Sequence, residues 1–151
     1  LVMVGEALVD ASLIQTQKID KLIKKLNLQK NVVKTGYVDE KDLIVLYNLA
    51  DLTILPSFYE GFGLPVLESM ACGTPVVCSD KGSLTEIIPD LAFICDPSDP
   101  ISIASKIREA LNLSWSEKAK ISQKLQKHAS QFSWDKVAQQ TIKIYQQVAN
   151  T

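Results

Sequence analysis

The sequence has little cysteine and little histidine, which limits the kinds of site it can form. Of its 151 residues, three are cysteine (Cys72, Cys78 and Cys95) and one is histidine, His128. An odd number of cysteines in apolar surroundings, without the spacing of a metal site, predicts buried free thiols. Free thiols persist in reducing compartments, so we expect a cytoplasmic protein. His128 lies in a predicted helix, where we expect it to pack or to face solvent rather than to catalyse.

An excess of charge of either sign is also absent. The chain has 16 Lys and Arg residues against 17 Asp and Glu residues, and no basic stripe or tail, which argues against nucleic acid or an anionic membrane surface as a partner. No apolar run approaches the ~20 residues of a transmembrane helix, and no signal-peptide pattern is present. Repeats and low-complexity stretches are lacking. We therefore expect one domain, 1–151, without a membrane segment.

The sequence does contain a regular alternation of short apolar runs and helical patterns. The apolar runs predict strands at 1–4, 31–35, 52–55, 75–79 and 91–95. Helical spacing of apolar residues fills most of the intervening segments, and the last predicted helix covers 133–151. Strands that alternate with helices predict an α/β fold with a Rossmann-like parallel sheet and helices on both faces.

The sequence predicts several helix N-caps and the burial of one group of aromatic residues. Ser114 with Glu117 predicts a capping box, and Asp39, Asp99 and Ser133 are predicted caps. The aromatic residues of the C-terminal helical region are expected in the core. These are Trp115, Phe132, Trp134 and Tyr145.

The most informative stretch runs from Pro56 to Glu68, between the predicted strand at 52–55 and a short helix predicted to begin at Pro65. Gly61 and Gly63 permit a tight bend and close approach of a ligand to the backbone. The first N–H groups of a helix have no partner inside the helix, and its dipole makes that end mildly positive. This arrangement is typical of a seat for a phosphate or a sugar hydroxyl.

Two carboxylates flank this stretch, Glu60 in the loop and Glu68 in the helix, eight positions apart. Glu68 stands beside Val66, Leu67 and Met70, so its carboxylate is expected to need a hydrogen-bond partner. A vicinal diol would serve. The other interpretation of the same residues is an ordinary turn with two solvated glutamates, because loose glycine motifs have many false positives.

The runs EGFGLPVLE and SMACGTPVVCSD, with seven residues between the two glutamates, resemble the donor-binding signature of retaining GT-B glycosyltransferases of group 1 (family 4). The resemblance extends from Val2 to about Tyr145. It implies the C-terminal, nucleotide-sugar-binding half of a GT-B enzyme. Such an enzyme transfers a sugar from a UDP-, GDP- or ADP-sugar to an acceptor hydroxyl with retention (EC 2.4, hexosyltransferase type). It also implies that no metal or other cofactor is needed, and the lack of an Asp-x-Asp motif fits.

The resemblance further implies roles for individual residues. Glu68 would bind the ribose hydroxyls of the donor, and Glu60, the catalytic candidate, would bind hydroxyls of the transferred sugar. Backbone N–H groups between them would bind sugar hydroxyls and phosphate, at Gly61, Phe62, Gly63 and Leu64.

The other predicted donor contacts lie where strands end, because ligands of parallel sheets bind at the carboxyl ends of the strands. Tyr37 and Val38 would lie against the base. Ser83 stands where the family often has a second glycine. The full set of these strand-end residues is Gly36, Tyr37, Val38, Ser57, Gly82, Ser83 and Thr85.

The family also has parts that this sequence does not contain. The Arg and Lys that stabilise the departing diphosphate normally follow a strand that precedes the one at 1–4. The acceptor is bound by an N-terminal domain, through which any peripheral membrane association would occur. We therefore expect a fragment of a longer enzyme, inactive by itself. In the family's sheet order, 3-2-1-4-5-6, the absent first strand is central, which leaves edges at 1–4 and 52–55 open to self-association.

Three alternatives to a glycosyltransferase module remain open from the sequence. One is a non-catalytic module of the same fold that binds a nucleotide or a sugar. Another is a flavodoxin-like regulatory or mononucleotide-binding domain. It would be expected to carry an acidic phosphoacceptor cluster or a phosphate-loop lysine after its first strand, and the sequence has neither. The third is a related GT-B epimerase.

Overall fold

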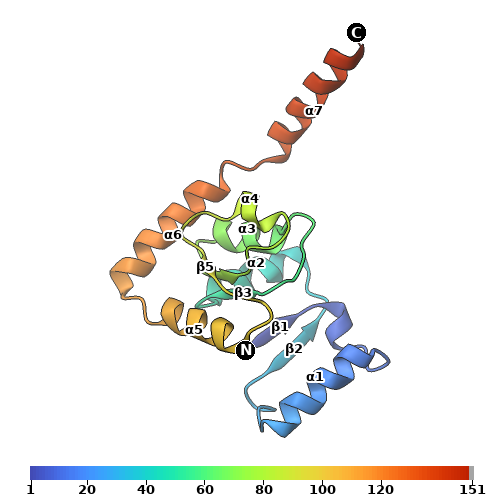
Figure 1. The fold of residues 1–151 in the computed structure, drawn as a ribbon, viewed down its shortest axis with the longest axis vertical. Helices are drawn as coiled ribbons and strands as arrows, with labels where there is room; N and C mark the ends of the chain where they lie inside the picture. The colour runs from blue at the N-terminus through green and yellow to red at the C-terminus, as the bar shows by residue number, and fades with distance from the viewer. Residues whose placement is uncertain (150–151) are drawn as a thin grey trace. The chain divides into compact units, whose positions relative to one another are not determined.

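The computed structural model describes residues 1–149, which fall into two compact units, one ending at Leu43 and one starting at Ile44. Helix α2 (Glu40–Leu49) crosses the boundary between them (Figure 1). The first unit has one parallel pair of strands, in which Val2 aligns with Val33. Its elements in chain order are β1 (Val2–Val4), η1 (Glu6–Leu8), α1 (Ile14–Lys25) and β2 (Val33–Gly36), and β1 and β2 form the pair.

The second unit contains a three-stranded parallel sheet in the order β3-β4-β5. Helices alternate with its strands and then follow one another to the C-terminus. The elements are β3 (Thr53–Leu55), α3 (Leu64–Ala71), β4 (Val76–Cys78), α4 (Leu84–Ile87), β5 (Phe93–Ile94), α5 (Pro100–Leu111), α6 (Trp115–Ala129) and α7 (Trp134–Ala149).

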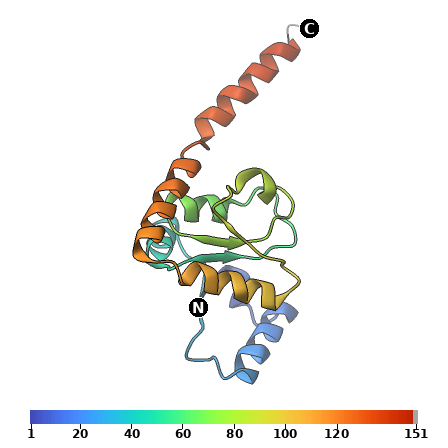
Figure 2. The same ribbon diagram turned by 60° about the vertical axis from the view of Figure 1, so that its left-hand side comes forward.

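Helices cover both faces of this sheet, as predicted. Val76 and Cys78 of β4 pack on one face with Val66 and Met70 of α3 and Leu125 of α6. The intervening residue, Val77, points to the other face and packs with Ala110 of α5, because successive side chains of a strand alternate between its faces. Figure 2 shows the strands between α3 on one side and α5 on the other. The α/β class and the parallel, Rossmann-like arrangement are confirmed.

Four strands, β1, β2, β3 and β5, have a strand partner on one edge only among residues 1–149. β1 pairs with β2 alone, and β3 pairs with β4 alone. This agrees with the expectation that the strands near 1–4 and 52–55 each lack a neighbour.

The predicted helix caps are present. Asp39 Oδ1 accepts from the N–H of Asp42 at 3.0 Å, and Asp99 Oδ1 accepts from Ile101 at 2.8 Å. Ser114 and Glu117 form the capping box at the start of α6. These short-range bonds satisfy N–H groups that a helix cannot satisfy itself.

The prediction that the C-terminal aromatic residues lie in the core is wrong for three of the four. Trp115 is 92% exposed, Trp134 77% and Tyr145 70%. Only Phe132 packs against the core, where its ring lies 5.5 Å from that of His128. Helical spacing shows which residues share a face of a helix, but it does not show whether another element covers that face. In α7 nothing covers it, because none of its described residues is buried.

His128 packs within the protein, as expected. Two of the three cysteines are buried, as predicted, and the third is not fully buried. His128 Nε2 lies 2.8 Å from the carbonyl oxygen of Ile87. Cys78 and Cys95 are buried free thiols, whereas Cys72 is only half-buried. Burial raises the pKa of the Cys78 thiol to about 12, so it stays protonated at neutral pH. Within the described part of the chain, no helix combines the length and the apolar character needed to cross a membrane.

Because Leu125 is fully buried and Trp115 is 92% exposed, the two residues should respond differently to truncation. Leu125→Ala should lower the free energy of unfolding by about 2–5 kcal/mol, since it leaves a cavity between α6 and the sheet. Trp115→Ala should change it by less than about 0.5 kcal/mol. Urea titration followed by far-ultraviolet circular dichroism measures both. Equal losses for the two variants would contradict this assignment of the core.

Candidate functional site

The loop that joins β3 to α3 is held in place by serine hydroxyls. Ser79, buried just after β4, donates its Oγ hydrogen to the carbonyl oxygen of Ser57. Ser57 Oγ in turn donates to Glu60 Oε1 at 2.6 Å. One carboxylate oxygen of Glu60 is therefore fixed by its own loop, and the side chain is half-buried.

A second loop, which follows β4, touches the first at the backbone of Glu60. The carbonyl oxygen of Glu60 accepts from Ser83 Oγ at 2.9 Å and from the Ser83 N–H at 3.4 Å. Gly82 has a φ of +60°, and a Cβ there would lie 2.9 Å from the same oxygen. The close approach of the two loops therefore requires glycine at position 82.

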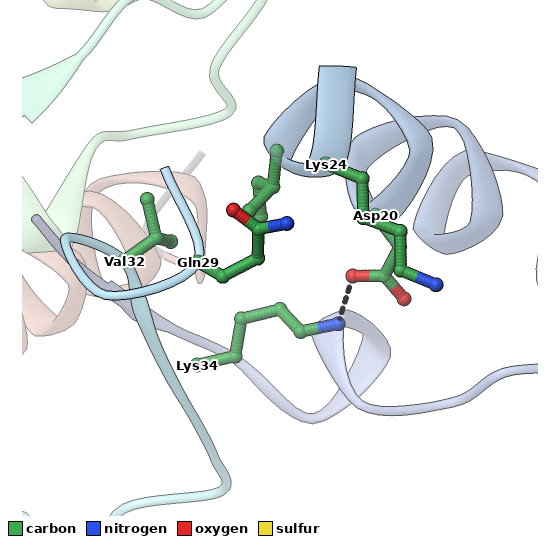
Figure 3. Close-up of a pocket in the computed structure, with 6 residues that line it drawn as sticks. Asp20, Lys24, Gln29, Val32 and Lys34 are labelled. Atoms are coloured by element: carbon green, nitrogen blue, oxygen red, sulfur yellow. Dashed lines mark hydrogen bonds and ion pairs between the residues drawn. The ribbon is translucent and has the colours of Figure 1, made fainter. Parts of the chain in front are cut away.

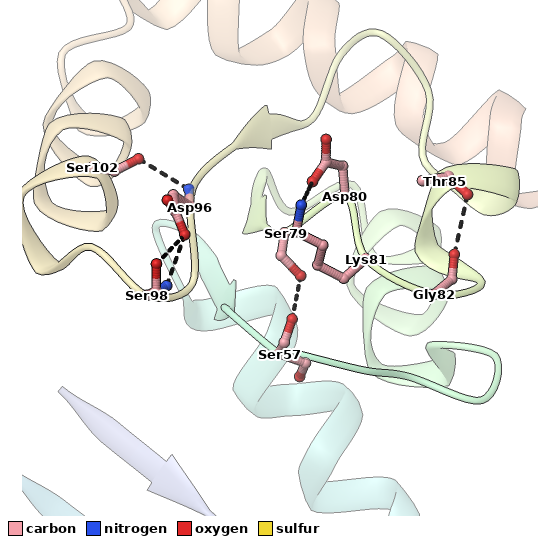
Figure 4. A network of polar contacts seen from close by, with 9 residues as sticks. All are labelled: Ser57, Ser79, Asp80, Lys81, Gly82, Thr85, Asp96, Ser98 and Ser102. Carbon is pink, nitrogen blue, oxygen red and sulfur yellow. Dashed lines mark hydrogen bonds and ion pairs between the residues drawn. The ribbon is translucent and has the colours of Figure 1, made fainter.

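Figure 4 shows the polar residues around this second loop. Thr85 Oγ1 donates to the carbonyl oxygen of Gly82 at 3.1 Å, which closes the turn. Lys81 Nζ lies 3.3 Å from Asp80 Oδ1. Thr85, one of the predicted donor contacts, is exposed to solvent.

The start of α3 leaves a run of backbone N–H groups open. The helix begins at Leu64, one residue earlier than predicted, so Pro65 is its second residue. Gly63, its N-cap, is left-handed with a φ of +95°. Among the described residues no protein acceptor is bonded to the N–H groups of Gly61, Phe62, Gly63 or Leu64. Gly61, Phe62 and Leu64 are exposed, whereas Gly63 is buried.

Glu68 differs from expectation, because its side chain is exposed and has a protein partner. Helix α3 buries Val66, Leu67, Ser69 and Met70. At about 100° of rotation per residue, Glu68 falls on the opposite side of the helix from this core face. Its carboxylate accepts a hydrogen bond from the hydroxyl of Tyr47, at 3.0 Å from Oε2.

Tyr47 was missed as a member of the site, although the sequence places it on the apolar side of the helix at 39–50. The only signal was a hydroxyl group on an otherwise apolar helix face. Burial raises the pKa of the Tyr47 phenol, and the hydrogen bond to Glu68 raises it further. The phenol therefore keeps its proton and acts as a donor.

Gly36 is the last residue of β2, and Tyr37 and Val38 follow it, all within the first unit. Gly36 has a φ of +71°, and a Cβ there would lie 3.2 Å from Val9 Cγ2. The carbonyl oxygen of Gly36 accepts from Gly5 at 3.0 Å. Tyr37 is 77% exposed.

Two hollows of the first unit are lined by none of the predicted site residues. One of about 320 Å³ is lined by residues of α1 and β2 and holds an ion pair of 2.6 Å between Lys34 and Asp20 (Figure 3). Another, of about 510 Å³, is formed around η1. In the described chain no three or more His, Cys, Asp and Glu side chains are grouped in a way that could hold a metal ion.

Comparison with known families supplies the decisive observation. The family model described as "Glycosyl transferases group 1" matches residues 1–131. The chain belongs to the group 1 glycosyltransferases.

Two curated relatives in this family are mannosyltransferases. O-antigen chain mannosyltransferase B of Escherichia coli is 47% identical over 111 residues, which are 73% of this chain and 29% of that protein. MMP alpha-(1->4)-mannosyltransferase of Mycolicibacterium hassiacum is 34% identical over 131 residues, 84% of this chain and 32% of that protein. This chain thus spans about a third of the length of these two relatives.

Solved structures agree with the fold. A glycosyltransferase of Rickettsia africae matches with a TM-score of 0.87 and 25% identity, over 98% of this chain and 39% of that one. Anabaena HepE in complex with UDP-glucose matches with a TM-score of 0.85 and 26% identity, over 97% and 40%. The C-terminal domain of a group 1 family protein of Francisella tularensis matches with a TM-score of 0.70 and 25% identity, over 82% and 64%. The chain is the C-terminal domain of a GT-B glycosyltransferase of group 1.

Gly63 and Gly61 provide a matched pair for testing the geometry of the loop. A Cβ at Gly63 would lie 2.5 Å from Leu84 Cδ2 and 3.0 Å from Ile87 Cδ1, whereas a Cβ at Gly61 would meet nothing within 4 Å. Gly63→Ala should therefore lower the free energy of unfolding by about 1–3 kcal/mol, since it combines a left-handed backbone with overpacking. Gly61→Ala should lower it by less than about 1 kcal/mol. Chemical denaturation of the two variants measures the difference, and a larger loss for Gly61→Ala would contradict the geometry.

Proposed function

We propose that this chain is the donor-binding domain, 1–151, of a retaining, family 4 glycosyltransferase of the hexosyltransferase type (EC 2.4). The longer protein would transfer a sugar from a nucleotide-diphosphate sugar to an acceptor hydroxyl. The observation that carries the proposal is the run of N–H groups without protein acceptors at 61–64, with Glu60 and Glu68 at its two ends. Further support comes from HepE, a neighbour whose structure contains UDP-glucose.

The open amides suit the diphosphate and the sugar of the donor. N–H groups at the start of a helix point toward the ligand, and the helix dipole favours negative charge there. Pro65 has no N–H, so the donors at this end are those of Leu64 and of the loop residues before it. Because the positions of these donors are set by Gly63 and by the contact of Gly82 with Glu60, they need little rearrangement on binding.

The two glutamates would have different tasks. The exposed carboxylate of Glu68 would accept hydrogen bonds from the ribose hydroxyls, because a carboxylate with a free oxygen can accept from a vicinal diol. Glu60 would accept from hydroxyls of the transferred sugar and hold it for reaction. The acceptor oxygen would replace the nucleotide phosphate at the anomeric carbon, and the nucleoside diphosphate would leave.

The remaining contacts stay predictions from the family resemblance. Tyr37 and Val38, with Gly36, are predicted to lie against the base. Gly82, Ser83 and Thr85 are predicted to border the donor, and Ser57 acts by holding Glu60.

The rest of the proposed enzyme lies outside this sequence. We propose that an Arg and a Lys stabilise the departing diphosphate by charge, so that the reaction needs no cofactor. The acceptor would be bound by a further domain, through which any peripheral membrane association would occur. The protein is proposed to be cytoplasmic. The helix predicted at 133–151 corresponds to α7 (Trp134–Ala149), and its last two predicted residues lie outside the described ones. The open strand edges are proposed sites of self-association if the chain is produced alone.

Glu68→Ala should weaken binding of the nucleotide by about 1–3 kcal/mol, because it removes a charged acceptor of the ribose hydroxyls. Titration of the full-length protein with UDP, GDP and ADP by calorimetry measures the effect. Glu109→Ala is the control, since Glu109 bonds Lys106 of the same helix, and it should leave affinity unchanged. A flat response of the unaltered protein to all three nucleotides would remove the proposed function.

Glu60→Ala should abolish sugar transfer while leaving the affinity for free nucleoside diphosphate nearly unchanged, because its carboxylate would contact the sugar and not the nucleotide. Release of nucleoside diphosphate from a donor sugar, compared with the nucleotide dissociation constant, separates the two effects. A loss of nucleotide affinity with intact turnover would reverse the roles proposed for Glu60 and Glu68. Nucleotide binding by the unaltered full-length protein without any transfer would instead favour a non-catalytic binding module.

A further inference from the structure

The carboxylate of Glu68 is held by a tyrosine from another helix. Tyr47 lies on α2, in the compact unit that begins at Ile44, and its side chain is half-buried. Its hydroxyl donates to Glu68 Oε2 at 3.0 Å. No other described group donates to the Glu68 carboxylate, so Oε1 remains free to accept.

The backbone of Tyr47 is itself fixed. Thr74, which is 4% exposed, donates its Oγ1 hydrogen to the Tyr47 carbonyl oxygen at 2.7 Å. Thr74 stands between α3 and β4, and its N–H bonds the carbonyl oxygen of Ser69 at 3.0 Å. The position of Tyr47 is therefore set by the same segment that ends α3.

Ser69 of α3 also takes part in this set of hydrogen bonds. Its Oγ is buried and lies 2.8 Å from Thr53 Oγ1 and 3.1 Å from the Thr74 carbonyl oxygen. Glu68 is the preceding residue in the chain. Hydrogen bonds thus link Ser69 to Thr74, Thr74 to Tyr47 and Tyr47 to Glu68, and the peptide bond between Glu68 and Ser69 completes the circuit. With the contact of Ser69 to Thr53, they tie α2, α3 and β3 together.

An exposed glutamate on a helix would otherwise sample several rotamers. Binding a diol would then require the side chain to be ordered at that moment, which weakens affinity. A tyrosine whose own backbone is held in place removes part of this cost in advance. The phenol keeps its proton because burial and the neighbouring carboxylate both raise its pKa.

We propose that Tyr47 is a positioning residue: it holds one carboxylate oxygen of Glu68 so that the other accepts hydrogen bonds from the ribose hydroxyls of the donor. This inference rests on the proposed role of Glu68 in nucleotide binding. It adds the residue that makes Glu68 selective for a ribose diol.

The test compares a ribonucleotide with its 2′-deoxy counterpart, because the difference between them isolates one of the two hydroxyls that Glu68 would bind. The full-length protein is titrated with UDP, GDP and ADP, and the tightest of the three is paired with its 2′-deoxy form. Tyr47→Phe keeps the ring and removes only the hydroxyl. It should weaken ribonucleotide binding by about threefold to tenfold and weaken 2′-deoxynucleotide binding, which keeps only the 3′-hydroxyl, by a smaller factor.

Two further variants complete the design. Glu68→Ala should bring the ribo-to-deoxy affinity ratio close to one, and adding Tyr47→Phe to it should cause no further change, because the two residues act as a unit. Tyr145→Phe is the matched control. The Tyr145 side chain is 70% exposed, and its loss of a hydroxyl should leave the ratio at its original value.

The possible failures are distinguishable. An equal loss for ribo- and deoxynucleotide in Tyr47→Phe would indicate a structural role for Tyr47 and overturn the inference. An unchanged ratio in Tyr47→Phe, together with a reduced ratio in Glu68→Ala, would also overturn it while leaving the proposed function in place. An unchanged ratio in Glu68→Ala would overturn both.

Discussion

The structure of the candidate site depends on a left-handed glycine at the start of α3. Gly63, with its φ of +95°, turns the chain so that the N–H groups of 61–64 have no acceptors among the described residues. The turn is packed from behind by Leu84 and Ile87 of α4, which leave no space for a Cβ. The same short segment therefore combines core packing behind Gly63 with N–H groups that have no acceptor in the described part of the chain.

The two glutamates at the ends of this loop are held in different ways. Glu60 is held locally, by Ser57 three residues before it and by the approach of Gly82 and Ser83 to its carbonyl oxygen. Glu68 is held at long range, by Tyr47 of α2. A group that touches the reacting sugar gains most from rigid placement. A carboxylate proposed to bind the ribose gains selectivity for the ribose hydroxyls when its free oxygen is held in a fixed position.

Several surfaces of the chain remain without partners inside it. The outer edges of β1 and β3 have no strand beside them among the described residues. The apolar stripe of α7, which includes Trp134, Tyr145 and Val148, is exposed. Both features belong to a chain that spans about a third of the length of its mannosyltransferase relatives. The core of the second unit, by contrast, is complete on both faces of β4.

The sequence by itself determined what depends on neighbours along the chain. The order of strands and helices, the caps at Asp39, Asp99 and Ser114, and the glycine loop before α3 were predicted, because turns, caps and helix starts are set by short-range sterics and hydrogen bonds. The motif from Glu60 to Glu68 likewise predicted the family. Tertiary structure alone decided that Tyr47 bonds Glu68, that Ser83 and Gly82 meet Glu60, and that Trp115 and Trp134 are exposed. Those outcomes depend on which segments pack together in space, and a hydrophobic pattern does not specify the partner of a face or the acceptor of a hydroxyl.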